Sequence, residues 1–165
     1  MDNQNQHFAF VAVLGAPNAG KSTLVNQLVG SKVSIVSPKV QTTRSRIRGI
    51  LVSGDTQLVL TDTPGIFKPG RRLDRAMVAS AWTEAEESDI RLLLIDATKG
   101  IDKNTASIIQ ILQQNKQKAI LVLNKIDLMV KDKLLPLIAQ LNQYPIFTET
   151  FMISAATGEN TTDLK

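Results

Sequence analysis

Two hydrophobic patterns alternate along this chain. In some segments almost every residue is apolar, which is typical of strands covered on both faces. In others apolar side chains recur every three or four residues, which predicts helices. The apolar runs occupy residues 8–14, 90–96, 118–124 and 151–154. The helix-periodic segments occupy residues 23–30, 73–87, 103–117 and 133–141. Strands that alternate with helices predict a mostly parallel sheet with helices on both faces.

A hairpin adds one antiparallel strand to this expected sheet. Residues 46–52 and 57–62 have strand character, and a Gly-Asp-Thr turn signal lies between them. A connection of this length joins antiparallel neighbours. We therefore expect an α/β fold with a six-stranded, mostly parallel sheet, one antiparallel edge strand and helices on both faces. The chain should end in a truncated last helix that begins near Asn160 or Thr161.

The composition indicates one domain with an aliphatic core. The chain has 165 residues, of which 43% are hydrophobic and only 4% aromatic. It contains no cysteine, which excludes disulfides and cysteine-ligated metals. No apolar run is long enough to span a membrane, and the polar start is unlike a signal peptide. The net charge of +4 favours a polyanionic partner such as nucleotide phosphates, RNA or a membrane surface, although a modest basic excess can also simply solvate the surface.

The segment between the first strand and the first helix fits a phosphate-binding loop. It reads Gly15-Ala16-Pro17-Asn18-Ala19-Gly20-Lys21-Ser22, and Thr23 completes the set of residues that we expect to bind nucleotide here. Its glycines let the backbone wrap around phosphate, while the backbone amides and the helix N-terminus supply positive potential. The Lys21 ammonium would neutralise the β and γ phosphates, and the Ser22 hydroxyl would bind Mg²⁺.

A second motif, Asp62-Thr63-Pro64-Gly65, follows the second strand of the hairpin. We expect Asp62 to hold Mg²⁺ through water and the Gly65 amide to approach the γ phosphate. A turn with proline at a favoured position would produce the same sequence. The assignment therefore depends on the position of the motif, after an apolar strand and downstream of the phosphate-binding loop.

A third motif, Asn124-Lys125-Ile126-Asp127, predicts selectivity for guanine. Guanine presents N1–H and a 2-amino group, two donors that the Asp127 carboxylate can accept together, whereas adenine lacks this arrangement. A buried acceptor left unpaired by the wrong base discriminates strongly. Asn124 and the Lys125 stem should pack against the base and tie this loop to the phosphate-binding loop. The segment Ser154-Ala155-Ala156 could add a backbone amide for the guanine oxygen.

These motifs, each at the carboxyl end of an expected strand, meet the requirement for crevice binding on a doubly wound sheet. On these residues the chain resembles the translation-factor-related P-loop GTPases over residues 8–163. Within them it is similar to the Era family, whose switch segment resembles residues 32–50 and whose last nucleotide box resembles residues 154–160. This resemblance implies the P-loop GTPase fold. It also implies that Thr42 or Thr43, of which we favour Thr43, reaches Mg²⁺ and the γ phosphate.

The resemblance also implies slow hydrolysis of GTP. Ile66 stands where signalling GTPases carry the glutamine that orients the attacking water. Catalysis should therefore depend on charge stabilisation by Lys21 and the loop amides, on Thr43 and Gly65, and on Mg²⁺ as cofactor. In relatives, the asparagine that corresponds to Asn18 helps to bind K⁺, which makes K⁺ a second candidate cofactor.

The biological role follows from the resemblance alone. It implies a GTP/GDP switch in small-subunit assembly and 16S rRNA maturation, in the cytoplasm or peripherally on the inner membrane. We expect a flexible tail at 1–7, a monomeric GTPase domain at 8–165, and a KH RNA-binding domain in the full-length protein. Three alternatives remain open: a Der-like or tRNA-modifying GTPase, a non-hydrolysing nucleotide-dependent binding module, and an ATP-using P-loop kinase, against which the third motif argues.

Overall fold

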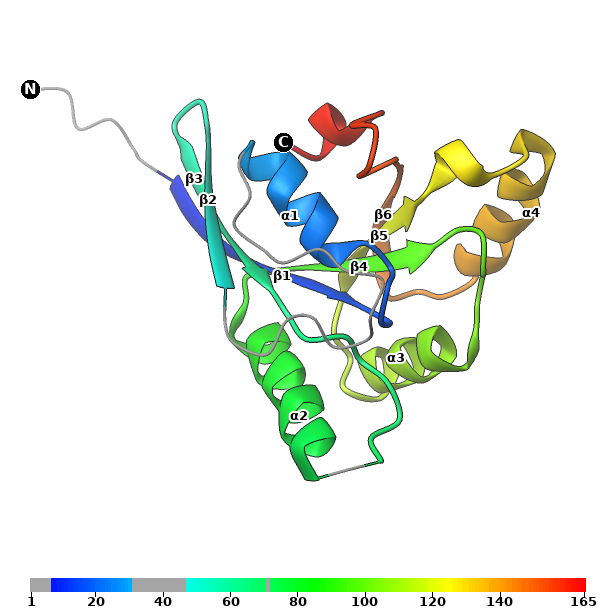
Figure 1. The fold of residues 1–165 in the computed structure, drawn as a ribbon, viewed down its shortest axis with the longest axis horizontal. Coiled ribbons are helices and arrows are strands. Elements are labelled where there is room, and N and C mark those ends of the chain that lie inside the picture. Colours follow the sequence, from blue (N-terminus) through cyan, green and yellow to red (C-terminus); the bar gives the residue numbers. More distant parts are fainter. Residues whose placement is uncertain (1–6, 31–46, 71) are drawn as a thin grey trace, which may run out of the picture.

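The computed structural model describes residues 7–30, 47–70 and 72–165. In this part of the chain a six-stranded sheet has the order β2-β3-β1-β4-β5-β6 (Figure 1). Its strands are β1 (His7–Gly15), β2 (Ile47–Ser53), β3 (Thr56–Asp62), β4 (Ile90–Asp96), β5 (Ala119–Asn124) and β6 (Phe147–Met152). Edge strand β2 runs antiparallel to β3, and the other neighbours are parallel. The expected fold class is confirmed.

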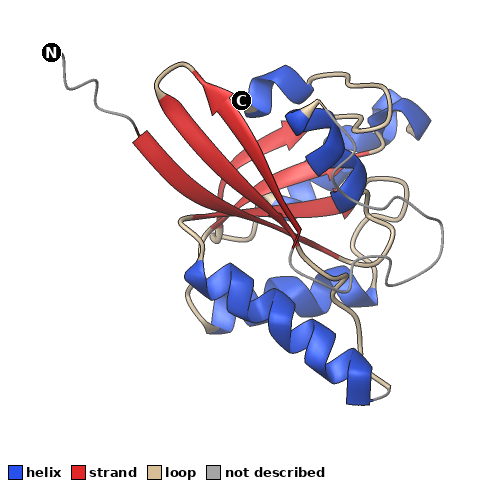
Figure 2. Cartoon of the chain, turned by 60° about the vertical axis from the view of Figure 1, so that its left-hand side comes forward, coloured by secondary structure: helices blue, strands red, loops and turns tan. Residues whose placement is uncertain are grey.

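Helices cover both faces of this sheet (Figure 2). They are α1 (Lys21–Val29), α2 (Arg72–Glu87), α3 (Lys103–Gln114) and α4 (Lys131–Leu141), with short 3₁₀ helices η1 (Ile126–Leu128) and η2 (Thr161–Leu164). Helices α2, α3 and α4 share one apolar cluster with the sheet, and α1 and η2 share the other. None of the helices in the described ranges is long and apolar enough to cross a membrane.

The apolar runs are continuous because the central strands are covered on both faces. In β4, Leu93 and Ile95 belong to the cluster beneath α2, α3 and α4, whereas Leu92 and Leu94 belong to the cluster beneath α1. Successive side chains of a strand point to opposite faces, so each of them needs an apolar partner. Burial of one such leucine stabilises the fold by about 2 kcal/mol. This packing holds the carboxyl ends of the central strands rigidly in place.

The expected strand bounds differ from the structure at both ends of the chain. We placed His7 in the polar tail, but it begins β1, and its N–H donates to Asp55 O at 2.9 Å. The last strand, expected at 151–154, spans Phe147–Met152. We missed its first half because Thr148 and Glu149 are polar and exposed, as an edge strand permits.

The bounds of two helices also differ. Helix α3 ends at Gln114 rather than at residue 117, because Lys116 adopts a positive φ of 53° and Gln117 N–H turns back to Leu112 O at 2.9 Å. Helix α4 begins two residues earlier than expected and contains Pro136. Asn160, one of the two expected caps near the end, does precede η2, but its side chain donates to Met152 O instead of capping the helix.

Candidate functional site

The four sequence motifs meet at one edge of the sheet. The phosphate-binding loop follows β1, residues 62–65 lie at the end of β3, residues 124–127 lie at the end of β5, and residues 154–156 follow β6. Since these four strands are parallel, their carboxyl ends point the same way. The structure therefore brings together every predicted site residue that it describes. Thr43 and its alternative Thr42 lie outside the described residues.

The two glycines of the phosphate-binding loop are required by close approach of neighbouring strands. A Cβ on Gly15 would lie 2.6 Å from Leu94 O of β4. Gly20 has a φ of 101°, and a Cβ there would collide with the Asn124 side-chain nitrogen. Between them, Ala19 N–H donates to Ala16 O at 3.3 Å and closes the turn. The loop is thus folded tightly over the ends of β4 and β5.

Lys21 lies inside the curl of this loop. Its ammonium donates to Ala16 O at 2.8 Å and to Gly15 O at 3.2 Å, and the residue is 7% exposed. Burial lowers the pKa of Lys21 to about 8, and the charge of Asp62 partly opposes that shift. A phosphate entering the loop would replace lost hydration with negative charge and favour the protonated form. The ammonium is therefore already placed for an anion.

Ser22 and Asp62 form a pair of oxygen donors beside the lysine. Ser22 Oγ donates to Asp62 Oδ2 at 2.5 Å, and Asp62 is completely buried at the end of β3. A hydroxyl and a carboxylate are hard oxygen ligands of the type that Mg²⁺ prefers. In the described ranges no group of three or more histidine or acidic side chains could hold a metal ion. The two oxygens of Ser22 and Asp62 therefore suit an ion whose other ligands are phosphate oxygens and water. Thr23, the next residue of α1, is half-buried.

The second motif is fastened to the phosphate-binding loop. Thr63 Oγ1 donates to Val13 O at 2.7 Å, and both Thr63 and Pro64 are buried. A Cβ on Gly65 would lie only 3.0 Å from Pro17 Cα. The absence of a side chain at Gly65 thus lets the two phosphate-facing segments touch.

Ile66 is part of the hydrophobic core. Its N–H donates to Gly15 O at 2.9 Å, and its side chain is 4% exposed within the cluster beneath α2 and α3. A side chain buried in this way cannot reach a water molecule above the phosphate-binding loop. The structure agrees with the expectation that no side chain replaces the water-orienting glutamine at this position.

Asn124 joins three of the motifs. It is 2% exposed; its Nδ2 donates to Ala19 O and its Oδ1 accepts from Ala155 N–H, both at 2.9 Å. The link to the phosphate-binding loop was expected, whereas the link to Ala155 was not. Ser154 N–H donates to Glu159 O at 3.0 Å. Within segment 154–156, the backbone N–H groups of Ser154 and Ala155 are thus engaged by the protein itself.

Lys125 and Asp127 complete the third motif, residues 124–127, which we call the base-binding loop after its expected role. Lys125 has a positive φ of 67°, which turns the chain into η1 and leaves Asp127 exposed in its first turn. The Lys125 ammonium does not project freely, because it donates to Asn18 O and to Asp96 Oδ2, each at 2.7 Å. Asp127, which we expected to be a buried acceptor, is thus exposed in this structure, whereas Lys125 is anchored.

Sequence reasoning missed Asp96. It ends β4, the one central strand to whose carboxyl end we had assigned no function, and it follows a run of buried aliphatic residues. The sequence did carry a signal for Asp96. It is an acidic residue at the carboxyl end of an apolar strand, in a sheet whose other parallel strands end in ligand motifs. Only the structure shows that Asp96 pairs with Lys125.

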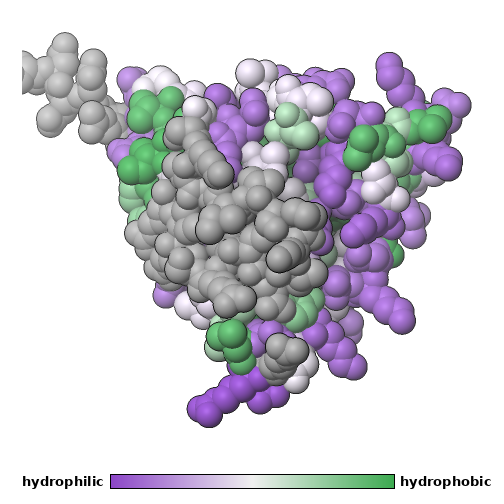
Figure 3. All heavy atoms as spheres, viewed as in Figure 1, coloured by the Kyte–Doolittle hydropathy of each residue, from purple (hydrophilic) through white to green (hydrophobic). Residues whose placement is uncertain are grey.

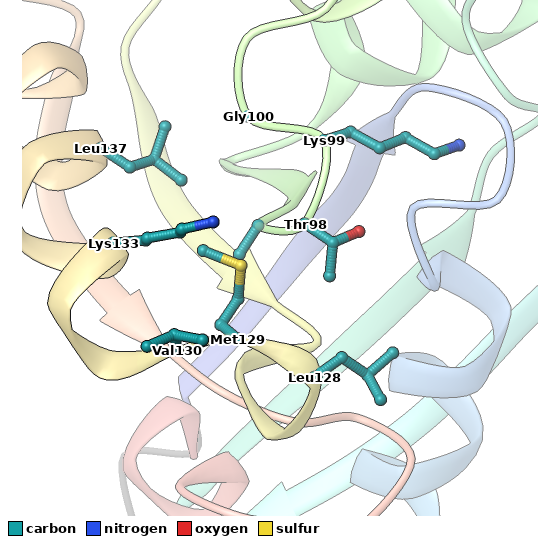
Figure 4. A pocket seen from close by; sticks show the side chains of 9 residues that line it. Thr98, Lys99, Gly100, Leu128, Met129, Val130, Lys133 and Leu137 are labelled. Carbon is teal, nitrogen blue, oxygen red and sulfur yellow. The ribbon is translucent and has the colours of Figure 1, made fainter.

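A hollow of about 430 Å³ lies on the outer side of the base-binding loop. It is formed between residues 97–100 and the start of α4, and Lys133 extends across it toward Met129 (Figure 4). Hydrophobic side chains interrupt the hydrophilic surface over α4 (Figure 3). Val130 and Leu135 are 62% and 73% exposed. None of the predicted site residues lines this hollow.

The sequence of this chain is similar to a family of known GTPases. A family model described as 50S ribosome-binding GTPase matches residues 10–125. GTPase Era of Bradyrhizobium sp. (strain ORS 278) is 55% identical over 156 residues, which are 94% of this chain and 51% of that protein. The chain thus spans about half the length of the curated relatives it matches.

Two solved structures share this fold. Era in complex with MgGDPNP and nucleotides 1506–1542 of 16S ribosomal RNA has a TM-score of 0.90 and 40% identity, covering 97% of this chain and 55% of that chain. A variant of Aquifex aeolicus Era bound to GDP and AlF4⁻ has a TM-score of 0.88 and 41% identity, covering 96% of this chain and 55% of that chain.

Proposed function

Because this chain belongs to the family described as 50S ribosome-binding GTPases and is of the Era type within it, we propose that it binds GTP and hydrolyses it to GDP and phosphate. The observation that carries this proposal is the junction at Asn124, whose side chain bonds both Ala19 of the phosphate-binding loop and Ala155 of the last motif. This junction gathers the phosphate and base subsites into one crevice, as a single nucleotide requires.

Each described motif has a role in this proposal. Residues 15–23 wrap the phosphates with backbone amides, and the Lys21 ammonium turns from the loop carbonyls to the phosphate oxygens. Ser22 and Asp62 would hold Mg²⁺ together with Thr43, and the ion would supply positive charge that offsets the charge of the phosphates. Asp127 accepts the two guanine hydrogens, with Asn124 and Lys125 against the base and the Ala156 amide at its oxygen.

Hydrolysis then rests on electrostatic stabilisation rather than on a side-chain base. The buried ammonium of Lys21, the loop amides and the Gly65 N–H face the transferring phosphoryl group in a site of low dielectric. Ile66 contributes nothing to orienting the water, so intrinsic turnover is slow. Asn18 is exposed in the phosphate-binding loop, where its side chain is available to help hold K⁺ as an additional positive charge.

The proposed biological role is assembly of the small ribosomal subunit by the full-length protein. A solved Era structure holds 16S ribosomal RNA, whereas the matching family description names the 50S particle. We give more weight to Era, because the match to Era covers 94% of this chain, whereas the family model covers only residues 10–125 and ends before Asp127. We propose that the protein acts in the cytoplasm and that its GTPase domain is a monomer. Its net positive charge would allow peripheral contact with an anionic inner membrane.

A non-hydrolysing binding module is the second candidate, favoured by the burial of Ile66. Isothermal titration with GDP, GTP and ATP in Mg²⁺ tests binding, and phosphate release in K⁺ against Na⁺ tests hydrolysis. We expect guanine nucleotides to bind, ATP not to bind, and release to be slow and faster in K⁺. Equal heats for GTP and ATP would refute the proposed site. Binding of GTP without turnover would favour the non-hydrolysing binding module.

A further inference from the structure

We propose that Asp96 is a positioning residue of the nucleotide site, which holds the Lys125 ammonium against the Asn18 carbonyl and so joins the base-binding loop to the phosphate-binding loop. This inference rests on the proposed function, since it concerns how the same crevice retains its nucleotide. Asp96 touches no phosphate or base itself in this assignment; it acts through Lys125.

The position of Asp96 in the sheet makes this role possible. Strand β4 lies between β1, which leads into the phosphate-binding loop, and β5, which leads into the base-binding loop. Asp96 is in register with Asn124, and Leu94, two residues earlier, is in register with Gly15. Ala97 N–H donates to Asn124 O at 2.9 Å and extends the pairing past the strand end. Asp96 therefore stands beside the origins of both loops.

Both carboxylate oxygens of Asp96 are engaged. Oδ2 pairs with Lys125 Nζ at 2.7 Å, while Oδ1 accepts from Thr98 N–H at 3.0 Å and from Thr98 Oγ1 at 2.6 Å. Burial acts to raise the pKa of Asp96, but the hydrogen bonds from Lys125 and Thr98 and the Lys125 charge together hold it below its ordinary value. The carboxylate is thus charged and fixed in orientation before any nucleotide arrives.

The lysine joins two backbone turns that are unfavourable by themselves. Lys125 has a φ of 67° and Asn18 a φ of 62°, both in the left-handed region that residues with a Cβ rarely adopt. Such conformations persist where the surroundings hold them. The Asp96–Lys125–Asn18 chain of contacts supplies that hold, because one ammonium binds the carboxylate and the Asn18 carbonyl at once.

The consequence for binding is preorganisation of the base subsite. Asp127 lies two residues after Lys125, so the direction of its carboxylate depends on the Lys125 turn. If Asp96 is neutralised, the ammonium loses its anion and the two loops are no longer tied. Part of the binding energy must then be used to order the two loops. The nucleotide therefore dissociates faster, and the site discriminates less well between bases.

The test replaces Asp96 by its neutral isostere, Asp96→Asn, and measures release of a fluorescent GDP analogue by stopped flow. We expect release to be about 10 to 100 times faster, in line with loss of a charge-assisted hydrogen bond. The preference for GDP over IDP, which lacks the 2-amino group, should fall at least about threefold.

Matched variants separate positioning from general stability. Asp102→Asn changes a second carboxylate of the same connection, which caps α3 through Thr105 N–H and does not touch Lys125, and asparagine caps equally well. It should behave as wild type. Thr98→Val removes one support of the Asp96 carboxylate at an exposed position, so it should fold normally and show the same pattern at about threefold faster release. If Asp96→Asn does not fold, the GDP release rate of Thr98→Val tests the inference in its place.

A double-mutant cycle with Lys125→Met identifies the partner. The effects of Asp96→Asn and Lys125→Met on GDP release should be strongly non-additive if Asp96 acts through Lys125. Unchanged release, unchanged preference for GDP over IDP, or additive effects would each overturn the inference. Failure of the wild-type chain to bind GDP would instead refute the proposed function, so the two failures are distinguishable.

Discussion

The side-chain amide of Asn124 donates to the backbone carbonyl of Ala19, a residue 105 positions earlier, over 2.9 Å. Its oxygen accepts from Ala155 N–H at the same distance, so one buried side chain holds three loops together. Several of the expected mutational effects follow from this junction and from the buried lysine nearby.

Asn124→Ala should weaken both stability and nucleotide binding. The change leaves Ala19 O and Ala155 N–H without their buried partner, which costs about 2 to 4 kcal/mol of the free energy of unfolding. GDP affinity should fall at least tenfold in calorimetry because the loops are no longer held together. Gln140→Ala, at an exposed position of α4, is the control and should change stability by less than about 0.5 kcal/mol in urea unfolding. Equal effects of the two variants would contradict the junction.

Gly20→Ala should be far more harmful than the same change at Gly30. Both glycines have a positive φ and flank helix α1, but a Cβ on Gly20 would collide with the Asn124 amide, whereas a Cβ on Gly30 meets nothing within 4 Å. Gly30→Ala should cost about 1 kcal/mol from backbone conformation alone. Gly20→Ala should cost at least about 2 kcal/mol more and abolish GDP binding. Chemical denaturation measures the difference, and equal costs would show that the collision is relieved.

Lys21 should make the stability of the nucleotide-free domain depend on pH. Burial lowers the pKa of Lys21 from 10.5 to about 8 in the folded chain. Between these values the unfolded chain holds a proton that the folded chain has released, so the free energy of unfolding rises with pH through this window. Below pH 8 the buried ammonium costs the folded state about 3 kcal/mol. Lys21→Met should therefore stabilise the nucleotide-free domain at pH 7 while it abolishes nucleotide binding.

The pH dependence of that gain is the decisive measurement. In urea unfolding, Lys21→Met should be more stable than wild type at pH 7, and the advantage should vanish toward pH 10.5, where wild-type Lys21 is neutral when folded. Lys103→Met, at an exposed position of α3, should show no such pH-dependent difference. A gain at pH 7 that persists unchanged at pH 10.5 would mean that the buried charge is not its cause.

Asp127→Asn should change which purine is bound. An amide can donate to the extra carbonyl of xanthine but cannot accept both guanine hydrogens, so GTP should bind at least about 100-fold more weakly and xanthosine triphosphate more tightly. Calorimetry with both nucleotides measures the reversal. Because Asp127 is exposed, thermal stability should remain near that of wild type. Unchanged selectivity would remove Asp127 from the base subsite.

Ile66→Gln should not create a faster GTPase. The side chain lies in the core at 4% exposure, so a glutamine there buries an amide and loses apolar packing, at a cost of about 2 to 4 kcal/mol. Single-turnover phosphate release should not rise. Ile66→Val, which keeps the apolar contact, should cost about 1 kcal/mol and leave the rate unchanged. A tenfold faster glutamine variant would show that the segment can turn its side chain toward the phosphate.

The motif residues were predictable because their chemistry is local. The phosphate-binding loop requires glycines, a lysine and a hydroxyl within eight consecutive residues, and its place after an apolar strand was readable without coordinates. The first half of β6 was not, because Thr148 and Glu149 on an exposed edge carry no apolar pattern. Asp96 was not either, because its meaning depends on Lys125, which only the pairing of β4 with β5 brings near.

Short segments of the chain already specify the alternation of strands and helices, the order of the motifs and the chemistry of each motif, since hydrophobic period and residue type are local properties. The folded structure was needed to show that Asn124 joins Ala19 to Ala155, that Ile66 lies in the core, and that Lys125 is bound by Asp96. These relationships depend on strand register and on which backbone groups are left to be satisfied when the loops pack together. Both are consequences of packing distant segments against one another, which no local pattern encodes.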